Sequence, residues 1–331
     1  MSRAHSATML AFACLAGFSL PAAQESAPRR PVHTFSIVAR DAQTGEIGVA
    51  VQSHWFQVGV DVIWAEAGVG AVATQSFIEP AYGPKGLALM RAGNDATEAL
   101  AKLIKADPAR ELRQVAMVDA RGGVGAWTGS KCIQAAGDLQ GASYSVQANL
   151  MEQKSVWPAM ARAFESSEGE ELAERLLRAL EAAQAEGGDI RGRQSAALLV
   201  VKAKGSGEVW NDRIVDLRVD DAPAPLAELR RLLAIHRAYA AMNVGDAAMA
   251  AGDLPAAKRA YAKAAARCPE SEEIRYWQAI TLFAAGDTAE ALAILDPLFN
   301  DPRWVELTRR LPPSGLLSQE DSRKILAIVD D

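Results

Sequence analysis

Cysteine and histidine are scarce in this 331-residue chain, which limits the chemistry available to it. The three cysteines and four histidines do not have the spacing of a metal-binding motif, and no glycine-rich phosphate loop is present. We therefore expect neither a metal nor a cofactor. Cys14 lies in an N-terminal apolar run, so a mature chain would keep only Cys132 and Cys268. These two fall in different predicted domains, so a disulfide framework is not expected.

Positively charged residues are also fewer than negatively charged ones. The formal net charge is −6 and the isoelectric point is about 5.4, a balance that argues against nucleic acid or an anionic membrane surface as the main partner. The N-terminal apolar run is too short to cross a bilayer, so we expect no membrane span. Half of the residues are apolar, which is enough to build one large domain and a smaller one.

The first residues have the pattern of a targeting segment. Residues 1–23 combine Arg3, the apolar run LAFACLAGFSL and the small-residue end PAA, which together indicate a cleaved secretory signal peptide. Residues 24–32 have the composition of a polar, proline-containing tether. We therefore expect an exported protein, located in a bacterial-type periplasm or secreted.

Residues 33–77 show the alternation that is typical of short strands. One strand face is unusually small, with Gly48 and Ala50, and such a face either lets another layer approach closely or leaves room for a pocket. Farther along, the chain reads as strands, helices, strands, helices and strands, with a last strand at Val209–Val219. This order favours two sheets between two helical layers over alternating β-α-β winding.

Helical, alanine-rich sequence replaces the strands over residues 224–331. The turns at Gly252 and Gly286 are 34 residues apart, and Ala257, Tyr261 and Ala264 follow the first turn at tetratricopeptide spacing. The segment therefore resembles a pair of tetratricopeptide repeats with a final helix near residues 316–329; the alternative is a generic helical bundle. Such repeats suggest a peptide or protein partner, and the alternative is a stabilising appendage.

Several phrases spread over residues 33–221 resemble one known family. In order along the chain they are TFSIVARD, IGVAVQS, AEAGVGAVATQ, YGPKGL, RQVAMVD, TGSKC, GDIRGRQSAALLVV and NDRIVDLRVDD. They resemble domain of unknown function 1028 (DUF1028), which is grouped with the N-terminal-nucleophile hydrolases. The resemblance implies an α+β fold, a four-layer αββα N-terminal-nucleophile hydrolase-like sandwich, with the small all-α tetratricopeptide-like domain following outside it. Ala148 departs from the family pattern, which usually has glycine there.

N-terminal-nucleophile chemistry requires Thr, Ser or Cys as the first residue, because its free α-amine acts as the general base for its own side chain. The resemblance gives this position to Thr34, which would need a second cleavage at the His33–Thr34 bond. The other implied site residues are Asn149 and the N–H groups near Thr74 and Gln75 for an oxyanion, Asp189 and Ser195 to orient the amine, and Arg191 to bind a substrate carboxylate. Gln52, on a strand face, completes the candidate substrate-binding set.

Each of these residues also has an ordinary structural interpretation. The alternatives are a strand start for Thr34, a strand-end cap for Asn149, a turn for Asp189, a plain strand residue for Ser195, and hydrogen-bonded core amides for Gln52 and Gln75.

Two functions of different classes follow. The first is a hydrolase that cleaves an amide bond in a peptide, an acyl-amino acid or a cell-wall fragment. The second is a non-catalytic periplasmic ligand-binding protein that contacts a protein partner through the repeats. Association of the helical layers into a homo-oligomer is compatible with either function.

Overall fold

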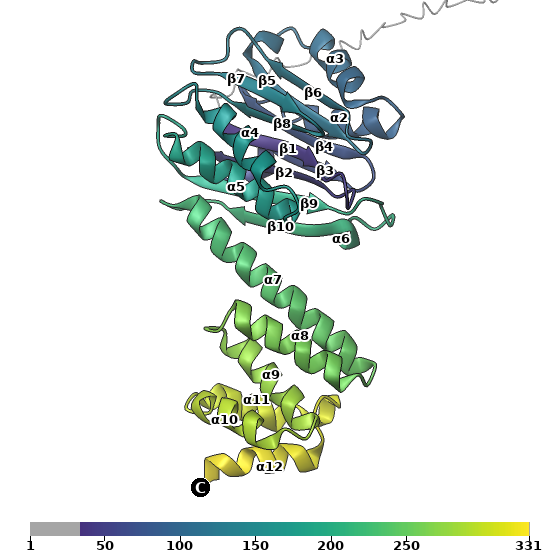
Figure 1. Cartoon of the computed structure of the whole chain (residues 1–331), viewed down its shortest axis with the longest axis vertical. Helices are drawn as coiled ribbons and strands as arrows, with labels where there is room; N and C mark the ends of the chain where they lie inside the picture. Colours follow the sequence, from purple (N-terminus) through teal and green to yellow (C-terminus); the bar gives the residue numbers. More distant parts are fainter. Residues whose placement is uncertain (1–33, 331) are drawn as a thin grey trace, which may run out of the picture. The chain divides into compact units, whose positions relative to one another are not determined.

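The computed structural model describes residues 34–330. The expected signal peptide, residues 1–23, and the tether, residues 24–32, lie outside the described residues. Sheets come first and helices follow toward the C-terminus, which confirms the expected mixed α+β organisation (Figure 1).

A six-stranded antiparallel sheet contains the start of the described chain. Its strand order is β10-β9-β2-β1-β8-β7, so β1 and β2 are central. The strands are β1 (Thr34–Arg40), β2 (Ile47–Ser53), β7 (Gly137–Gly141), β8 (Tyr144–Ala148), β9 (Ser195–Val201) and β10 (Arg213–Val219).

A four-stranded antiparallel sheet, in the order β3-β4-β5-β6, packs on one face of the first sheet. Its strands are β3 (Ile63–Glu66), β4 (Gly70–Ser76), β5 (Arg113–Asp119) and β6 (Val124–Thr128). Apolar side chains fill most of the space between the sheets, among them Val49, Val51, Ala73 and Leu199. The two sheets therefore share one core.

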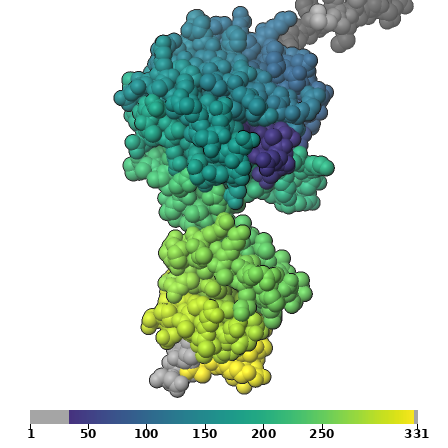
Figure 2. Space-filling model, viewed as in Figure 1, coloured from purple at the N-terminus to yellow at the C-terminus, as the bar shows by residue number. Residues whose placement is uncertain are grey.

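Helices cover the outer face of each sheet (Figure 1). The six-stranded sheet carries α4 (Val156–Ser166) and α5 (Leu172–Ala185), and the four-stranded sheet carries α2 (Tyr82–Arg91) and α3 (Ala96–Ala106). In the space-filling view, the start of the described chain, drawn in purple, is visible only in a small area of the face shown (Figure 2). The central strands are thus enclosed by the layers around them.

The alternation of β1 and β2 assigns each face to one layer. Phe35 and Ile37 point toward α4 and α5, whereas Val49 and Val51 point toward the second sheet. The small face of β2 explains how closely α5 approaches, because a Cβ added at Gly48 would lie 2.6 Å from Leu176 Cδ1. The expectation of close layer packing at this glycine is confirmed.

Local details differ from the expectations. The expected strand Val209–Val219 begins only at Arg213, and its first residues form the short helix α6 (Val209–Asp212). The Asp212 carboxylate accepts hydrogen bonds from the N–H of Ser206 at 2.8 and 3.1 Å, which favours a compact turn there. Strand β7 and helix α1 (Val58–Asp61) had no recognisable pattern, and short 3₁₀ helices lie at Arg110–Leu112 and Pro312–Ser314.

Consecutive helices form hairpins after the last strand. The helices are α7 (Pro225–Ala250), α8 (Leu254–Arg267), α9 (Glu272–Ala284), α10 (Thr288–Leu298), α11 (Pro302–Arg310) and α12 (Gln319–Asp330). Gly245 of α7 lets α8 approach, because an added Cβ would lie 2.7 Å from Tyr261 Cδ2. Gly252 and Gly286 both have positive φ, at 74° and 89°, and end α7 and α9 in the same way. None of the helices within residues 34–330 combines the length and the apolarity that a membrane crossing needs.

Candidate functional site

A group of buried polar side chains interrupts the apolar space between the two sheets. We call it the amide cluster; its members are Thr34, Ser36, Gln75, Gln114, Gln147 and Asn149, all fully buried. Cross-strand register brings them together, because Ser36 lies opposite Gln147, and Gln75 lies opposite Gln114. Buried polar groups are costly unless they are hydrogen bonded, so the stability of the cluster depends on the bonds among its members.

The backbone oxygen of Thr34 is one centre of the amide cluster. It accepts a hydrogen bond from the backbone N–H of Asn149 at 3.1 Å and lies 3.5 Å from Asn149 Nδ2. Gln75 Nε2 donates to the same oxygen at 3.2 Å. The structure therefore brings together three residues that the sequence singled out, Thr34, Gln75 and Asn149.

Gln114 is the second centre, and sequence reasoning missed it. Its Oε1 accepts from Gln75 Nε2 at 2.7 Å and from Asn149 Nδ2 at 2.9 Å. Its Nε2 donates to the Ala148 oxygen and to Thr128 Oγ1, both at 2.9 Å. The available signal was the phrase RQVAMVD, in which Gln114 shares a strand face with the apolar residues Ala116 and Val118.

Ser36 and Gln147 close the cluster on its other side. Ser36 Oγ donates to Gln75 Oε1 at 2.6 Å, and Gln147 Nε2 donates to Ser36 Oγ at 2.5 Å. Each buried amide thus has partners from a neighbouring strand or from the facing sheet. Such a network fixes side-chain orientations, because a side chain that turned away would leave buried donors or acceptors unpaired.

Ser195 lies in the same row of the sheet as Thr34, but not beside it. Register pairs Thr34 with Ser53, and Ser53 with Ser195. Two strand spacings of about 4.8 Å put Ser195 at about 10 Å from Thr34, beyond direct hydrogen bonding. Ser195 Oγ instead accepts from the N–H of Val58 at 3.1 Å and donates to the oxygen of Trp55. Ser53, which the sequence analysis did not single out, is the neighbouring hydroxyl.

Asp189 and Arg191 form a pair at the turn before β9. The Asp189 carboxylate accepts from Arg191 Nη2 at 2.7 Å and from the backbone N–H of His54 at 3.1 Å. The Asp189 side chain is fully buried, and the Arg191 side chain is 29% exposed. The pair thus ties this turn to the end of β2 and leaves part of the guanidinium facing solvent.

Thr74 and Gln52 point away from the amide cluster. Thr74 shares the outer face of β4 with Val72; its N–H donates to the Val62 oxygen at 3.0 Å and its Oγ1 to the Glu79 oxygen at 3.3 Å. Gln52 is on the face of β2 that packs on the helices. Its buried amide has no hydrogen-bond partner within the described part of the chain.

Cys132 is a poor candidate nucleophile. It is buried, and its Sγ donates to the Arg113 oxygen at 3.3 Å. Burial raises the pKa of its thiol above the ordinary value of 9.0, so little thiolate forms at neutral pH.

Fold and site together define a class: an α+β protein of two stacked antiparallel sheets with helices on both outer faces and a neutral cluster of amides and hydroxyls between them. Residues 34–229 match the family model described as "Family of unknown function (DUF1028)". The chain belongs to this family, and the resemblance stated from the sequence is confirmed.

Similarity to other known proteins covers both regions of the chain. The crystal structure of protein SPO2555 from Silicibacter pomeroyi, itself described as DUF1028, shares 32% sequence identity with a TM-score of 0.54; the match covers 61% of this chain and 88% of that chain. Residues 248–304 match a tetratricopeptide repeat model, which confirms the repeat resemblance. No curated protein matches the chain.

Proposed function

We propose that this chain is an exported amide-bond hydrolase of the N-terminal-nucleophile type, with Thr34 as the nucleophile. The observation that carries the proposal is the position of Thr34, which begins a central strand on the inter-sheet face with Asn149 Nδ2 3.5 Å from its backbone oxygen. The layering of sheets and helices supports assignment of residues 33–221 to a four-layer αββα sandwich of this hydrolase class. The substrate would be a peptide, an acyl-amino acid or a cell-wall fragment.

The reaction starts with cleavage of the His33–Thr34 bond, which gives Thr34 a free α-amine. An α-amine with a pKa of about 8 can take the proton of Thr34 Oγ1 at neutral pH. The oxygen attacks the substrate carbonyl carbon, and Asn149 Nδ2 donates to the oxyanion that forms. The protonated amine then gives its proton to the leaving amine as the C–N bond breaks. Water hydrolyses the ester, releasing the acid and restoring the hydroxyl.

The amide cluster would supply the rigidity that this chemistry needs. Gln114 Oε1 holds the amide groups of both Asn149 and Gln75, so Asn149 does not have to reorient when charge develops on the substrate. Fixed donors stabilise an oxyanion more effectively than donors that must first rearrange.

Variants at Thr34 test the role directly. A chain that starts at Thr34 is assayed on a library of amides, with the released amine as the readout. Thr34→Ala should lose activity by about 10³-fold or more, as expected when a nucleophile is removed, while Thr34→Ser keeps part of it. A Thr34→Ala protein that folds and cleaves amides as fast as the parent would refute the assignment.

The non-catalytic alternative has its own support. Thr34 is fully buried, and the amides around it are hydrogen bonded to one another, as in a structural core. In this account the mature chain would begin near Gln24 and keep residues 24–33. It would bind a small ligand in the periplasm, and the helices after residue 224 would contact a protein partner.

A further inference from the structure

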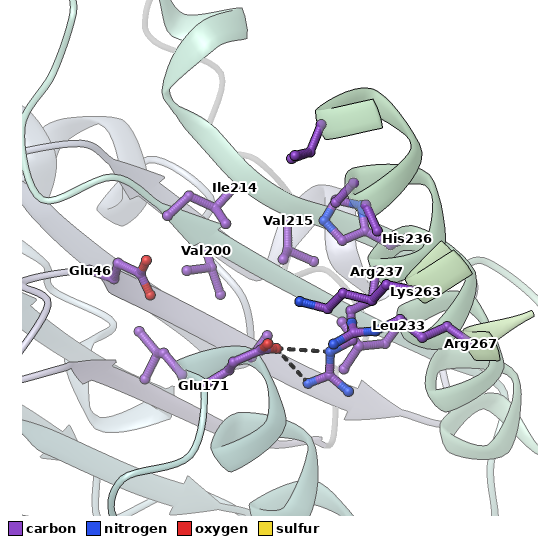
Figure 3. A pocket seen from close by; sticks show the side chains of 15 residues that line it. Glu46, Glu171, Val200, Ile214, Val215, Leu233, His236, Arg237, Lys263 and Arg267 are labelled. Carbon is purple, nitrogen blue, oxygen red and sulfur yellow. Dashed lines mark hydrogen bonds and ion pairs between the residues drawn. The ribbon is translucent and has the colours of Figure 1, made fainter. Parts of the chain in front are cut away.

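A hollow of about 390 Å³ is lined by the outer side of the six-stranded sheet, the start of α5, and helices α7 and α8 (Figure 3). Its floor is apolar and includes the buried side chains of Val200, Val215 and Leu233. Val200 is five residues from Ser195 along β9 and on the opposite face of the sheet, so the hollow is at least about 17 Å from the Thr34 row. It is therefore separate from the candidate active site.

The charges around the hollow are divided by sign. Glu46 and Glu171 line one side, and His236, Arg237, Lys263 and Arg267 come from the helices on the other side (Figure 3). Arg237 is paired with Glu171, which leaves Glu46 on one side of the apolar floor and Lys263 and Arg267 on the other. This division matches a ligand that has an ammonium group at one end and a carboxylate at the other.

Several of these charges lack a counter-charge within the described part of the chain. Within residues 34–330, Lys263, Arg267 and Glu46 make no ion pair, although Glu171 is paired with Arg237 at 2.8 Å. Burial, followed by the negative charges of Asp41 and Glu171, raises the pKa of Glu46. A nearby ammonium group would lower the pKa of Glu46 again, whereas a nearby anion would raise it further.

We propose that this hollow binds a short peptide with free ends, its α-ammonium beside Glu46 and Glu171, its carboxylate beside Lys263 and Arg267, and an apolar side chain on the floor. The volume is in the lower part of the range of about 300–1,000 Å³ typical of small-ligand sites, which suits two or three residues. The assignment does not depend on the chemistry at Thr34, because the hollow is separate from the Thr34 row.

Binding to the full-length chain is measured by calorimetry with the tripeptide Ala-Leu-Ala, its N-acetyl form and its C-terminal amide. Blocking either end should weaken binding by about tenfold, at the low end for hydrogen bonds to charged groups. Lys263→Gln combined with Arg267→Gln should weaken the free peptide and remove the difference between acid and amide, while keeping the difference made by acetylation. Glu46→Gln should reduce the effect of acetylation only.

The matched control is Lys105→Gln, an exposed charge on α3 in the opposite helical layer, which should leave all three affinities unchanged. Thermal unfolding of each variant checks that the fold is retained. No binding of Ala-Leu-Ala up to 10 mM, or binding that ignores both end groups, would overturn the proposal. A loss for Lys105→Gln that is half or more of the loss for the Lys263/Arg267 pair would do the same, since binding would then follow net charge.

Discussion

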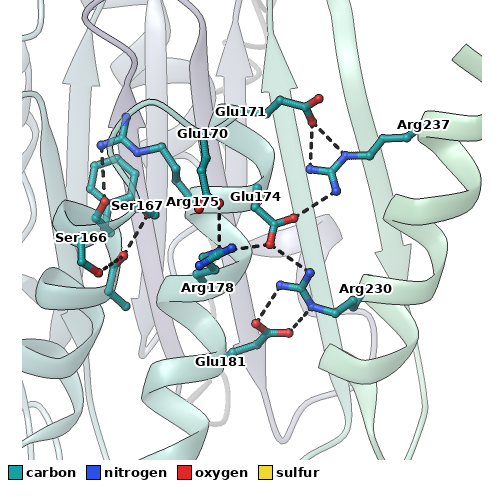
Figure 4. A network of polar contacts seen from close by, with 12 residues as sticks. Ser166, Ser167, Glu170, Glu171, Glu174, Arg175, Arg178, Glu181, Arg230 and Arg237 are labelled. Atoms are coloured by element: carbon teal, nitrogen blue, oxygen red, sulfur yellow. Dashed lines mark hydrogen bonds and ion pairs between the residues drawn. The ribbon is translucent and has the colours of Figure 1, made fainter. Parts of the chain in front are cut away.

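Helix α5 is joined to α7 by charged side chains that converge on Glu174 (Figure 4). Its carboxylate accepts from Arg230 Nη1 and Arg237 Nη1, both at 3.0 Å, and from Arg178 Nε at 3.2 Å. The Glu174 side chain is 12% exposed, whereas those of Arg230 and Arg237 are 41% and 24% exposed. The carboxylate is thus nearly buried among cations that remain partly hydrated.

Replacing Glu174 with Gln keeps the shape and removes the charge. Breaking a fully buried ion pair costs about 3–5 kcal/mol, but the exposure of the arginines screens these contacts, so we expect a loss of about 2 kcal/mol. For a domain of this size that corresponds to a fall in melting temperature of about 4–8 °C. Calorimetry gives the melting temperature, and hydrogen exchange in α7 shows whether its docking on α5 is what weakens.

The charge on Glu174 also gives the effect a pH dependence. Burial raises the pKa of this carboxyl, but the hydrogen bonds and charges of Arg230 and Arg237 outweigh it, so the pKa ends below the ordinary 4.5. A lowered folded-state pKa gives stability that is fully present above 4.5 and is lost as the pH falls through the folded value. The melting temperature of the parent should therefore approach that of Glu174→Gln as the pH falls below the folded-state pKa of Glu174.

An exposed ion pair within α7 provides the control. Glu228 and Arg231 of α7 are both exposed and contact each other within one turn, so Glu228→Gln should leave the melting temperature almost unchanged, because solvent screens an exposed ion pair. If Glu174→Gln and Glu228→Gln have the same melting temperature at neutral pH, the charges around Glu174 have no role in docking α7 on α5.

Two further substitutions probe the sandwich. Gln114→Leu should destabilise the fold by about 2–5 kcal/mol in urea unfolding, because the Ala148 oxygen and an N–H of Asn149 lose their partner; an unchanged midpoint would show that the amide cluster is dispensable. Gly48→Val should cost about 1–3 kcal/mol through overpacking against Leu176, even though valine favours strands; a more stable variant would contradict the packing described at α5.

Periodicity predicted strands with two different faces, because each strand face has its own environment. The alternation of Phe35 and Ile37 with Ser36 and Val38 survives in the structure as a helix-facing side and a sheet-facing side. β7 escaped notice because it has glycine at both ends and one large apolar residue, Leu139. Pairing with β8, a tertiary contact, is what makes it a strand.

The candidate site was only partly predictable from the sequence. Family resemblance pointed to Thr34, Gln75 and Asn149, which lie together, but the partners that hold them come from register between distant segments. Gln114 accepts a hydrogen bond from Asn149 of the facing sheet, and no local sequence pattern predicts that contact. The same limit applies to Ser195, whose place two strands from Thr34 follows from strand order alone.

The central claim is that Thr34 becomes the first residue of the mature chain. Intact-mass measurement with N-terminal sequencing of the protein recovered from the periplasm of an expressing bacterium tests it most directly. We predict a chain that begins with Thr-Phe-Ser at residue 34. A stable, fully exported chain that begins near Gln24 and is never shortened further would contradict the account, because Thr34 would then have no amine to act as its base.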